Sequence, residues 1–298
     1  LIERSIGAGH RKHEPYVWIR TNNRTTFKIN IFLIMKIAIL GAGNLGLSIG
    51  RGLITNNSLT QLYLTRRSVE SIASWTEYAN TYVTADNKKA VQESDIIILA
   101  VQPRQLNGLL EEIKDLLHEN HVLMSTVTGF SISKMEEVVG HDVFIIRSMP
   151  NTAISVGKSM TCLCANKKGT ERLPIAEAIF NGLGTSIVIE EQHMRAATVI
   201  CASGIAFWMR LIRATTQGGV QLGFDADEAM KMSMHTAMGA ASLLIETGAH
   251  PEEEIDKVTT PRGCTIEGLN EMEHQGLSSS LIQGIVSSFK KINEIAQD

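Results

Sequence analysis

KIAILGAGNLG, residues 36–46, joins a short apolar run to a glycine-rich turn. The run has the Ile-rich character of a buried strand, and the residues after the turn suit the start of a helix. In that context the GxGxxG spacing is typical of a turn that binds the pyrophosphate of a dinucleotide; a glycine-rich turn that binds nothing is the alternative. The first glycine permits the bend, the second lets the backbone approach the pyrophosphate, and the third allows close helix–strand packing. The residues predicted to bind cofactor here are Gly41, Gly43, Asn44, Leu45 and Gly46.

Outward from this turn, apolar runs alternate with stretches long enough for a helix or turn. Such alternation predicts an α/β fold with a right-handed, parallel, doubly wound sheet of the Rossmann type. The predicted strands are Lys36–Leu40, Gln61–Thr65, Thr81–Thr84, Asp95–Val101, His121–Thr126 and Val143–Arg147, followed by Ser159–Ala165 and Ser186–Glu190. The predicted crossover helices or turns are Asn44–Thr55, Ser68–Tyr78, Lys88–Ser94, Gln105–Glu119 and Ser131–Val139, with a further helix around Thr170–Phe180.

The strand signal ends near residue 190, and the rest of the chain is predicted to be all-helical. Met194–Ala214 interleaves small and large apolar residues, as in a helix packed closely on others. Asp225 is a candidate N-cap of a helix that ends at Gly248, and Pro251 suits the first turn of the next helix. The last helix is predicted to open at Ser278–Ser280. Because helices this apolar need a surface to pack on, we predict an obligate homodimer, possibly a higher oligomer of dimers, through the residues beyond 190.

The first 34 residues differ from the rest, since they hold six basic residues and two acids in a chain whose net charge is −3. We interpret residues 1–34 as a leader or an artificial extension, with a transit peptide as the alternative. The predicted domains are therefore 35–190, which binds the cofactor, and 191–298, which is helical and mediates dimerisation and substrate binding.

Composition narrows the class of protein. The chain is 44% hydrophobic and 20% charged over 298 residues, which are ordinary globular values. The longest apolar runs, 29–40 and 96–101, are too short to span a bilayer. Four cysteines without a dense framework favour a reducing, cytoplasmic compartment, and no metal-ligand spacing is visible. We expect no metal and neither nucleic acid nor membrane as a partner.

The second strand ends in Thr65, Arg66 and Arg67, where an NAD enzyme would place an acidic residue on the ribose hydroxyls. A hydroxyl and two guanidinium groups instead fit a 2′-phosphate, so we predict NADP, with NADPH preferred over NADH. A solvated arginine pair is the alternative. The fourth and sixth strands end at the same edge of the predicted sheet. There we predict cofactor contacts from Ala100, Val101, Gln102 and Pro103, and from Asn151, for which a turn asparagine is an equal alternative.

A polar loop separates two of the predicted C-terminal helices. It contains Thr260-Pro261-Arg262-Gly263-Cys264-Thr265. Successive free N–H groups across Gly263–Thr265 would bind a carboxylate without any basic side chain. A capped helix–helix turn is the alternative.

Taken together, these motifs resemble the pyrroline-5-carboxylate reductase family: GAGNLG, AVQP, RSMPNT, ASGIAF and TTPRGCTIEGL occur in order between Met35 and Ile295. The resemblance implies NADPH-dependent reduction of the cyclic imine 1-pyrroline-5-carboxylate to L-proline, the last step of proline biosynthesis. It also implies an active site between the nucleotide domain of one subunit and helices of the dimer. By the same resemblance, backbone amides of the loop hold the substrate carboxylate and the Thr265 hydroxyl bonds the imine nitrogen. The implied substrate-binding residues are Thr260, Gly263, Cys264 and Thr265.

Three segments depart from the family pattern. The usual SGSGPAY reads CASGIAF from Cys201 to Phe207, SPGG reads TPRG at 260–263, and the lysine of AVKP is Gln102. Two other functions are considered: a related two-domain reductase acting on another imine or a carbonyl, and a non-catalytic NADP-binding protein. Carbonyl reductases of this plan resemble one another in a lysine proton donor on the first helix of the second domain, and no lysine occurs between Lys168 and Lys231.

Overall fold

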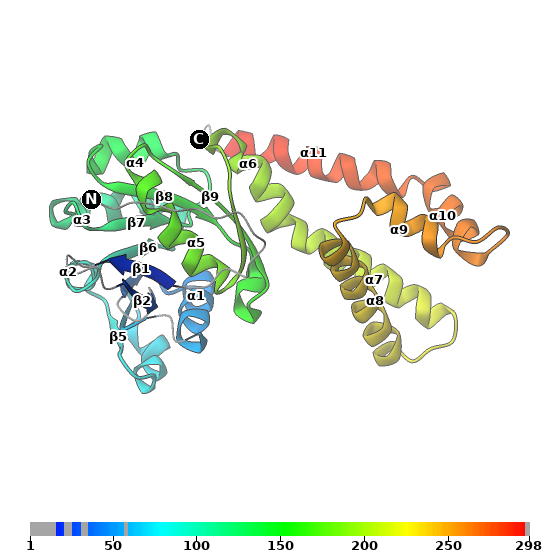
Figure 1. Ribbon diagram of the computed structural model, residues 1–298, viewed down its shortest axis with the longest axis horizontal. Helices are drawn as coiled ribbons and strands as arrows, with labels where there is room; N and C mark the ends of the chain where they lie inside the picture. Colours follow the sequence, from blue (N-terminus) through cyan, green and yellow to red (C-terminus); the bar gives the residue numbers. More distant parts are fainter. Residues whose placement is uncertain (1–15, 21–25, 31–34, 57–58, 296–298) are drawn as a thin grey trace. The chain divides into compact units, whose positions relative to one another are not determined.

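The computed structural model describes residues 16–20, 26–30, 35–56 and 59–295. The chain forms two compact units, the first comprising residues 1–202 with 292–298 and the second residues 203–291 (Figure 1). The division falls after Ala202 rather than after Glu190, because Met194 and Val199 are buried in the first unit. Within the N-terminal extension, β1 (Tyr16–Arg20) pairs antiparallel with β2 (Thr26–Asn30), and the remainder of residues 1–34 lies outside the described residues.

The first unit contains an eight-stranded, mostly parallel sheet, which confirms the predicted Rossmann-type fold. Its strands are β3 (Lys36–Leu40), β4 (Gln61–Thr65), β5 (Thr81–Thr84), β6 (Ile96–Leu99), β7 (Val122–Ser125), β8 (Phe144–Met149), β9 (Ser159–Ala165) and β10 (Gly184–Val188). They lie in the order β10-β9-β8-β7-β6-β3-β4-β5. The one antiparallel pairing is β8 with β9. Only residues 150–158 connect these two strands, which is too short for the helical crossover that a parallel pairing needs.

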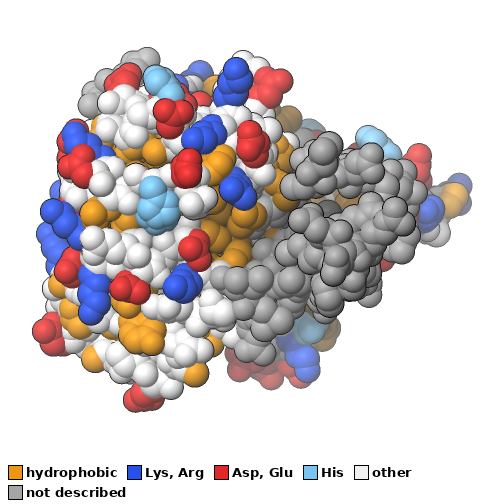
Figure 2. All heavy atoms as spheres, turned by 60° about the vertical axis from the view of Figure 1, so that its left-hand side comes forward, with side chains coloured by type: hydrophobic (Ala, Val, Ile, Leu, Met, Phe, Trp, Pro, Cys, Tyr) orange, Lys and Arg blue, Asp and Glu red, His pale blue; other side chains and the backbone are white. Residues whose placement is uncertain are grey.

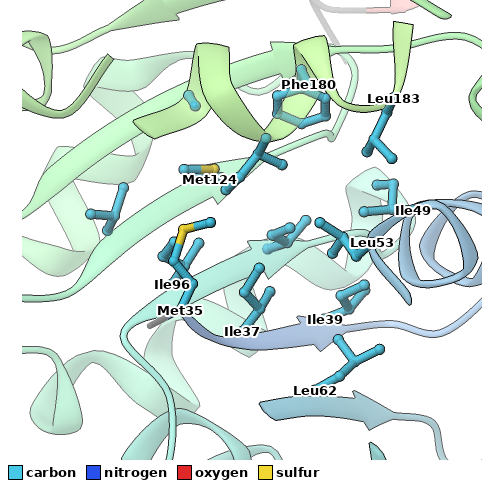
Figure 3. Close-up of a cluster of buried hydrophobic side chains, with 14 of the residues drawn as sticks. Met35, Ile37, Ile39, Ile49, Leu53, Leu62, Ile96, Met124, Phe180 and Leu183 are labelled. Atoms are coloured by element: carbon cyan, nitrogen blue, oxygen red, sulfur yellow. The ribbon is translucent and has the colours of Figure 1, made fainter. Parts of the chain in front are cut away.

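Alternation along β3 divides the core between the two faces of the sheet. Ile37 and Ile39 point to one face and Ala38 and Leu40 to the other, and all four are fully buried. On the first face, β3 packs with Ile49 and Leu53 of helix α1 and with Phe180 of α5 (Figure 3). The helices of this unit are α1 (Asn44–Thr55) and α5 (Leu173–Asn181) on the first face, and α2 (Asn87–Gln92), α3 (Pro103–Ile113) and α4 (Ile132–Val139) on the second.

Several connections in this unit are 3-10 helical, and the predicted stretch at 68–78 is one of them. There a 3-10 segment covers Val69–Glu77 and is interrupted at Ile72, whose φ of −130° is not helical. The remaining 3-10 segments are Lys114–Leu116, Thr152–Val156, Gly169–Arg172 and Glu191–His193. Acidic and basic side chains are interspersed over the face of the first unit that Figure 2 shows.

The C-terminal part is helical, as predicted, but the stretch expected to be one helix at 194–214 is divided. α6 (Met194–Ala197) passes through a π-helical segment, Thr198–Ser203, into α7 (Gly204–Gln221). The other helices are α8 (Ala226–Thr247), α9 (Pro251–Val258), α10 (Cys264–His274) and α11 (Leu277–Ile295). Asp225 and Gly248 flank α8 as predicted, and Gly248 adopts the left-handed φ of 64° that ends a helix.

The second unit leaves many large apolar side chains exposed in the single chain. Trp208 is 63% exposed and Ile245 is 79% exposed. The methionines of α8, interpreted from the sequence as packing residues, are exposed as well: Met230, Met232, Met234 and Met238. One continuous helical stretch in the described chain, Glu191–Gln221, is long and apolar enough to cross a membrane, a property that the uninterrupted apolar runs did not reveal. The surface of this unit needs a partner of some kind.

Candidate functional site

A cavity of about 580 Å³ lies in the first unit, at the carboxyl ends of β3, β4 and β6. It brings together most of the residues predicted to bind the cofactor. Asn44, Leu45 and Gly46 form the first turn of α1 and Pro103 begins α3, so these four lie behind the residues that line it. The lining residues are Gly41, Ala42, Gly43, Thr65, Arg66, Arg67, Ala85, Asn87, Ala100, Val101, Gln102, Gln105, Leu109 and Glu112.

The three glycines of the turn meet different neighbours. Gly41 has a φ of 98°, and a Cβ atom there would lie 2.8 Å from the carbonyl oxygen of Ala100. A Cβ atom at Gly46 would lie 2.6 Å from the carbonyl oxygen of Gly41. A Cβ atom at Gly43 would meet nothing within 4 Å, although Gly43 lines the cavity and is the N-cap of α1. Since glycine cannot cap the helix with a side chain, the first amides of α1 are available to an anion, which fits a pyrophosphate.

This difference predicts that Gly43→Ala and Gly46→Ala have separable effects. Gly43→Ala should leave the melting temperature unchanged and weaken NADPH binding about ten-fold, because its methyl group occupies space needed by the pyrophosphate. Gly46→Ala should instead lower the free energy of unfolding by about 1–3 kcal/mol through overpacking. Thermal unfolding and fluorescence titration measure both quantities. Equal destabilisation by the two substitutions would contradict the assignment of Gly43 to the cofactor.

Thr65 fixes the glycine turn from behind and is only 2% exposed. Its carbonyl oxygen accepts from the N–H groups of Gly41 at 3.2 Å and Ala42 at 2.7 Å. Its hydroxyl donates to Oδ1 of Asn87 at 2.6 Å, and Nδ2 of Asn87 donates to Oε2 of Glu112 at 3.1 Å. Thr65 is therefore held in a hydrogen-bonded chain that shapes the cavity.

Sequence reasoning missed Asn87, Gln105 and Glu112, although all three line the cavity. The available signal was Asn87, a polar residue just after the third strand at the carboxyl edge. Arg66 and Arg67 are both exposed at the cavity, and Nη1 of Arg66 donates to the carbonyl oxygen of Ala42 at 3.1 Å. The two guanidinium groups therefore lie at the edge of the sheet where the 2′-phosphate was predicted.

Asn151 is buried and does not line the cavity. Its Oδ1 accepts from the N–H of Ala153 at 3.0 Å, and its Nδ2 donates to the carbonyl oxygen of Cys201 at 3.0 Å. The amide thus caps the 3-10 segment after β8 and joins it to the π-helical segment. A contact between Asn151 and the cofactor stays a prediction.

The loop predicted to bind the substrate carboxylate lies in the second unit and forms a tight turn. The N–H of Gly263 donates to the carbonyl oxygen of Thr260 at 2.9 Å, and Arg262 has a φ of 57°. Pro261 followed by a residue of positive φ is typical of a type II turn. A Cβ atom at Gly263 would collide with the Thr260 side chain. Thr260, Gly263, Cys264 and Thr265 are therefore gathered at one helix start.

Helix α10 begins at Cys264 with Gly263 as its N-cap, so no side chain of the cap residue competes for the first amides. Cys264 is exposed and Thr265 is half-buried. Partially positive N–H groups at such a helix start bind carboxylates. In the part of the chain that the structure describes, no group of three or more His, Cys, Asp or Glu side chains could hold a metal ion.

Comparisons with known proteins cover both parts of the chain. A family model described as "Pyrroline-5-carboxylate reductase dimerisation" matches residues 191–295, and one described as "NADP oxidoreductase coenzyme F420-dependent" matches residues 36–129. Pyrroline-5-carboxylate reductase 2 of Dictyostelium discoideum is 43% identical over 273 residues, covering 86% of this chain and 91% of that protein. The chain belongs to the pyrroline-5-carboxylate reductase family.

Other members of the pyrroline-5-carboxylate reductase family agree with this assignment. The Arabidopsis thaliana reductase is 31% identical over 272 residues, covering 88% of this chain and 96% of its own length. Pyrroline-5-carboxylate reductase 1 of D. discoideum is 45% identical over 269 residues, and this chain spans 49% of its length. Among solved structures, the reductase of Coxiella burnetii is similar with a TM-score of 0.81 and 28% identity, covering 87% of this chain and 98% of that one. The resemblance expected from the motifs is confirmed.

Proposed function

We propose that this protein reduces 1-pyrroline-5-carboxylate to L-proline with NADPH as the hydride donor. The observation that carries the proposal is the coexistence, in one member of this family, of a cavity beside the GAGNLG turn and an anion-binding helix start at Gly263–Thr265. The first suits a dinucleotide, and the second suits the carboxylate of a small imino acid.

NADP is the cofactor that the cavity fits. The match of residues 36–129 to a family described as an NADP oxidoreductase supports it. So does the fold of a Plasmodium falciparum reductase solved with NADP bound, which is 24% identical with a TM-score of 0.79. Arg66 and Arg67 would bind the 2′-phosphate, and they support a preference for NADPH over NADH. When bound, the reduced nicotinamide supplies the hydride.

The chain's own residues then have to bind, orient and shield the substrate. Amides at the start of α10 would hold the carboxylate, and the hydroxyl of Thr265 would orient the ring nitrogen. A cyclic imine is readily protonated, so the reaction needs accurate positioning more than a strong acid. A neutral hydroxyl is sufficient to support the nitrogen as it becomes an amine.

Imine reduction by the purified protein tests this function directly. With 1-pyrroline-5-carboxylate and NADPH, we expect the cofactor to be oxidised and one proline to form for each NADPH consumed. Activity on a 2- or 3-oxo acid, without activity on the imine, would favour the carbonyl reductase. NADPH binding without turnover of either compound would favour a non-catalytic NADP-binding protein.

We also propose that the protein is an obligate homodimer through its second unit. The match of residues 191–295 to a dimerisation family supports self-association, and the exposed apolar side chains of α7 and α8 need such an interface. Light scattering should find a dimer or a higher oligomer. Trp208→Glu, on the exposed face of α7, should shift the protein towards monomers, whereas Val156→Glu in the first unit, 71% exposed, should not. A stable, active wild-type monomer at micromolar concentration would contradict the proposal.

The same interface accounts for the apolar helical stretch Glu191–Gln221, since it begins where the match to the dimerisation family begins. We therefore propose that its apolar face packs on a second subunit rather than in a bilayer. A cytoplasmic location is proposed on the separate ground that all four cysteines are free thiols, which suits a reducing compartment.

A further inference from the structure

Two cysteine side chains lie close together outside the cavity and outside the 260–265 loop. Cys162 belongs to β9 and is 1% exposed, whereas Cys201 belongs to the π-helical segment and is half-buried. Their Sγ atoms are 3.8 Å apart, and both residues belong to the first compact unit. A disulfide has an S–S distance of about 2.05 Å, so these sulfurs need approach by less than about 2 Å to bond.

The two thiols are not equivalent. The hydrogen bond from the Cys162 thiol stabilises the thiolate of Cys201 and lowers the pKa of Cys201 to about 7, against an opposing effect of burial. The hydrogen bond to Cys201, together with burial, raises the pKa of Cys162. At pH 7 Cys201 is thus about half thiolate, compared with about 3% for a thiol of ordinary pKa near 8.5. The more exposed sulfur is therefore also the more nucleophilic one.

The geometry points to a redox modification site: we propose that Cys201 reacts with hydroperoxides and that Cys162 resolves the product as a reversible disulfide. The Cys201 thiolate attacks the O–O bond of the hydroperoxide, giving a sulfenic acid and, after protonation, an alcohol or water. The Cys162 sulfur then attacks the Cys201 sulfur, and the hydroxyl of the sulfenic acid leaves with the Cys162 proton as water. Two thiols lose two electrons, and the hydroperoxide gains them.

The disulfide would form where two segments already meet. Asn151, just after β8, donates to the carbonyl oxygen of Cys201, and Cys162 lies opposite Met149 in the pairing of β8 with β9. A Cys162–Cys201 bond would therefore tie the π-helical segment covalently to the sheet, close to the junction after Ala202. The family motif has serine at the position of Cys201, and a serine hydroxyl cannot form this bond. The site is thus a property of this chain and goes beyond the proposed reductase function.

Cys164 provides a matched control on the same strand. It is buried, and burial raises the pKa of its thiol to about 11. Peroxide should therefore leave Cys164 reduced, and Cys164→Ser should oxidise as the wild type does. Cys264 is exposed and tests whether accessibility alone decides reactivity.

The experiment treats the reduced, full-length protein with hydrogen peroxide and maps its cysteines by alkylation and mass spectrometry. We expect the loss of two of the four thiols, a Cys162–Cys201 cross-linked peptide, and full reversal by dithiothreitol. In Cys162→Ser, dimedone should trap a sulfenic acid at Cys201; in Cys201→Ser, Cys162 should stay reduced.

Oxidation confined to Cys264, absence of the cross-linked peptide in the wild type, or no dimedone adduct in Cys162→Ser would each overturn the proposal. A disulfide between the Cys201 residues of two subunits would also overturn it, because Cys162 would then have no role. The wild-type measurement is informative even if a variant fails to fold. None of these readouts uses reductase activity, so their failure is distinguishable from failure of the proposed function.

Discussion

Replacing both Arg66 and Arg67 with alanine is expected to weaken NADPH binding roughly 100-fold or more and to leave NADH binding almost unchanged. Both side chains line the cavity, and Arg66 is held over the glycine turn by its bond to the Ala42 carbonyl. Each charge-assisted hydrogen bond to phosphate is worth about 1.5–3 kcal/mol, and NADH has no 2′-phosphate to lose. Titration of each variant with both cofactors measures the two affinities.

Arg104→Ala is the matched control for this experiment. Arg104 is exposed next to the cavity, but its Nε donates to Oε1 of Gln102 and it does not line the cavity. Its removal subtracts one nearby positive charge and should change NADPH affinity by less than about three-fold at physiological salt, because exposed charges are screened. Equal losses for NADPH and NADH in the double variant would show that the arginines support the fold of the cavity rather than the 2′-phosphate.

The sheet could be predicted in detail because its strands are buried on both faces. Buried parallel strands are near-continuous apolar runs, and the predicted bounds of β3, β4, β5 and β9 agree residue for residue with the structure. The antiparallel pairing of β9 with β8 is a property of the short connection rather than of either strand, so hydrophobic pattern alone did not reveal it. The division of the helix at 194–214 was likewise invisible, since the π-helical segment Thr198–Ser203 is as apolar as its neighbours.

The cofactor cavity was predictable to the extent that it depends on topology. Parallel strands end at one edge, and this brought Gly41, Thr65 and Ala100 together from three separate motifs. Contacts that depend on long-range side-chain geometry were not predictable. The bond from Asn87 to Glu112 is one, and the bond that occupies Asn151 with Cys201 is another. A polar residue at the correct edge can thus serve the fold rather than the ligand.

Arg262 illustrates how the structure resolves a departure from the family motif. Its φ of 57° lies in the region that glycine adopts freely, and an arginine pays roughly 1–2 kcal/mol to adopt it. The turn survives because Pro261 and the hydrogen bond from Gly263 to Thr260 hold it. Backbone amides at the start of α10 therefore remain available despite the change of side chain.

Thr265→Val is expected to lower kcat/KM for the imine about 10- to 100-fold, which corresponds to about 1.4–3 kcal/mol of lost transition-state stabilisation. Valine keeps the shape and β-branching of threonine, so the half-buried position in α10 should stay packed. Only the hydroxyl is lost, at the stage when the ring nitrogen becomes an amine. NADPH affinity should not change, because Thr265 belongs to the second unit and the cavity is lined only by residues of the first.

Thr259→Val separates a substrate contact from a hydroxyl that merely supports a helix end. The Thr259 hydroxyl donates to the carbonyl oxygen of Ile255 at 2.7 Å, so its loss should reduce stability slightly and leave kcat/KM within about two-fold. If Thr265→Val behaves in the same way, its hydroxyl is also structural. The ring nitrogen would then have to be oriented by another group, and the carboxylate site at Gly263–Thr265 would lose the residue that connects it to the chemistry.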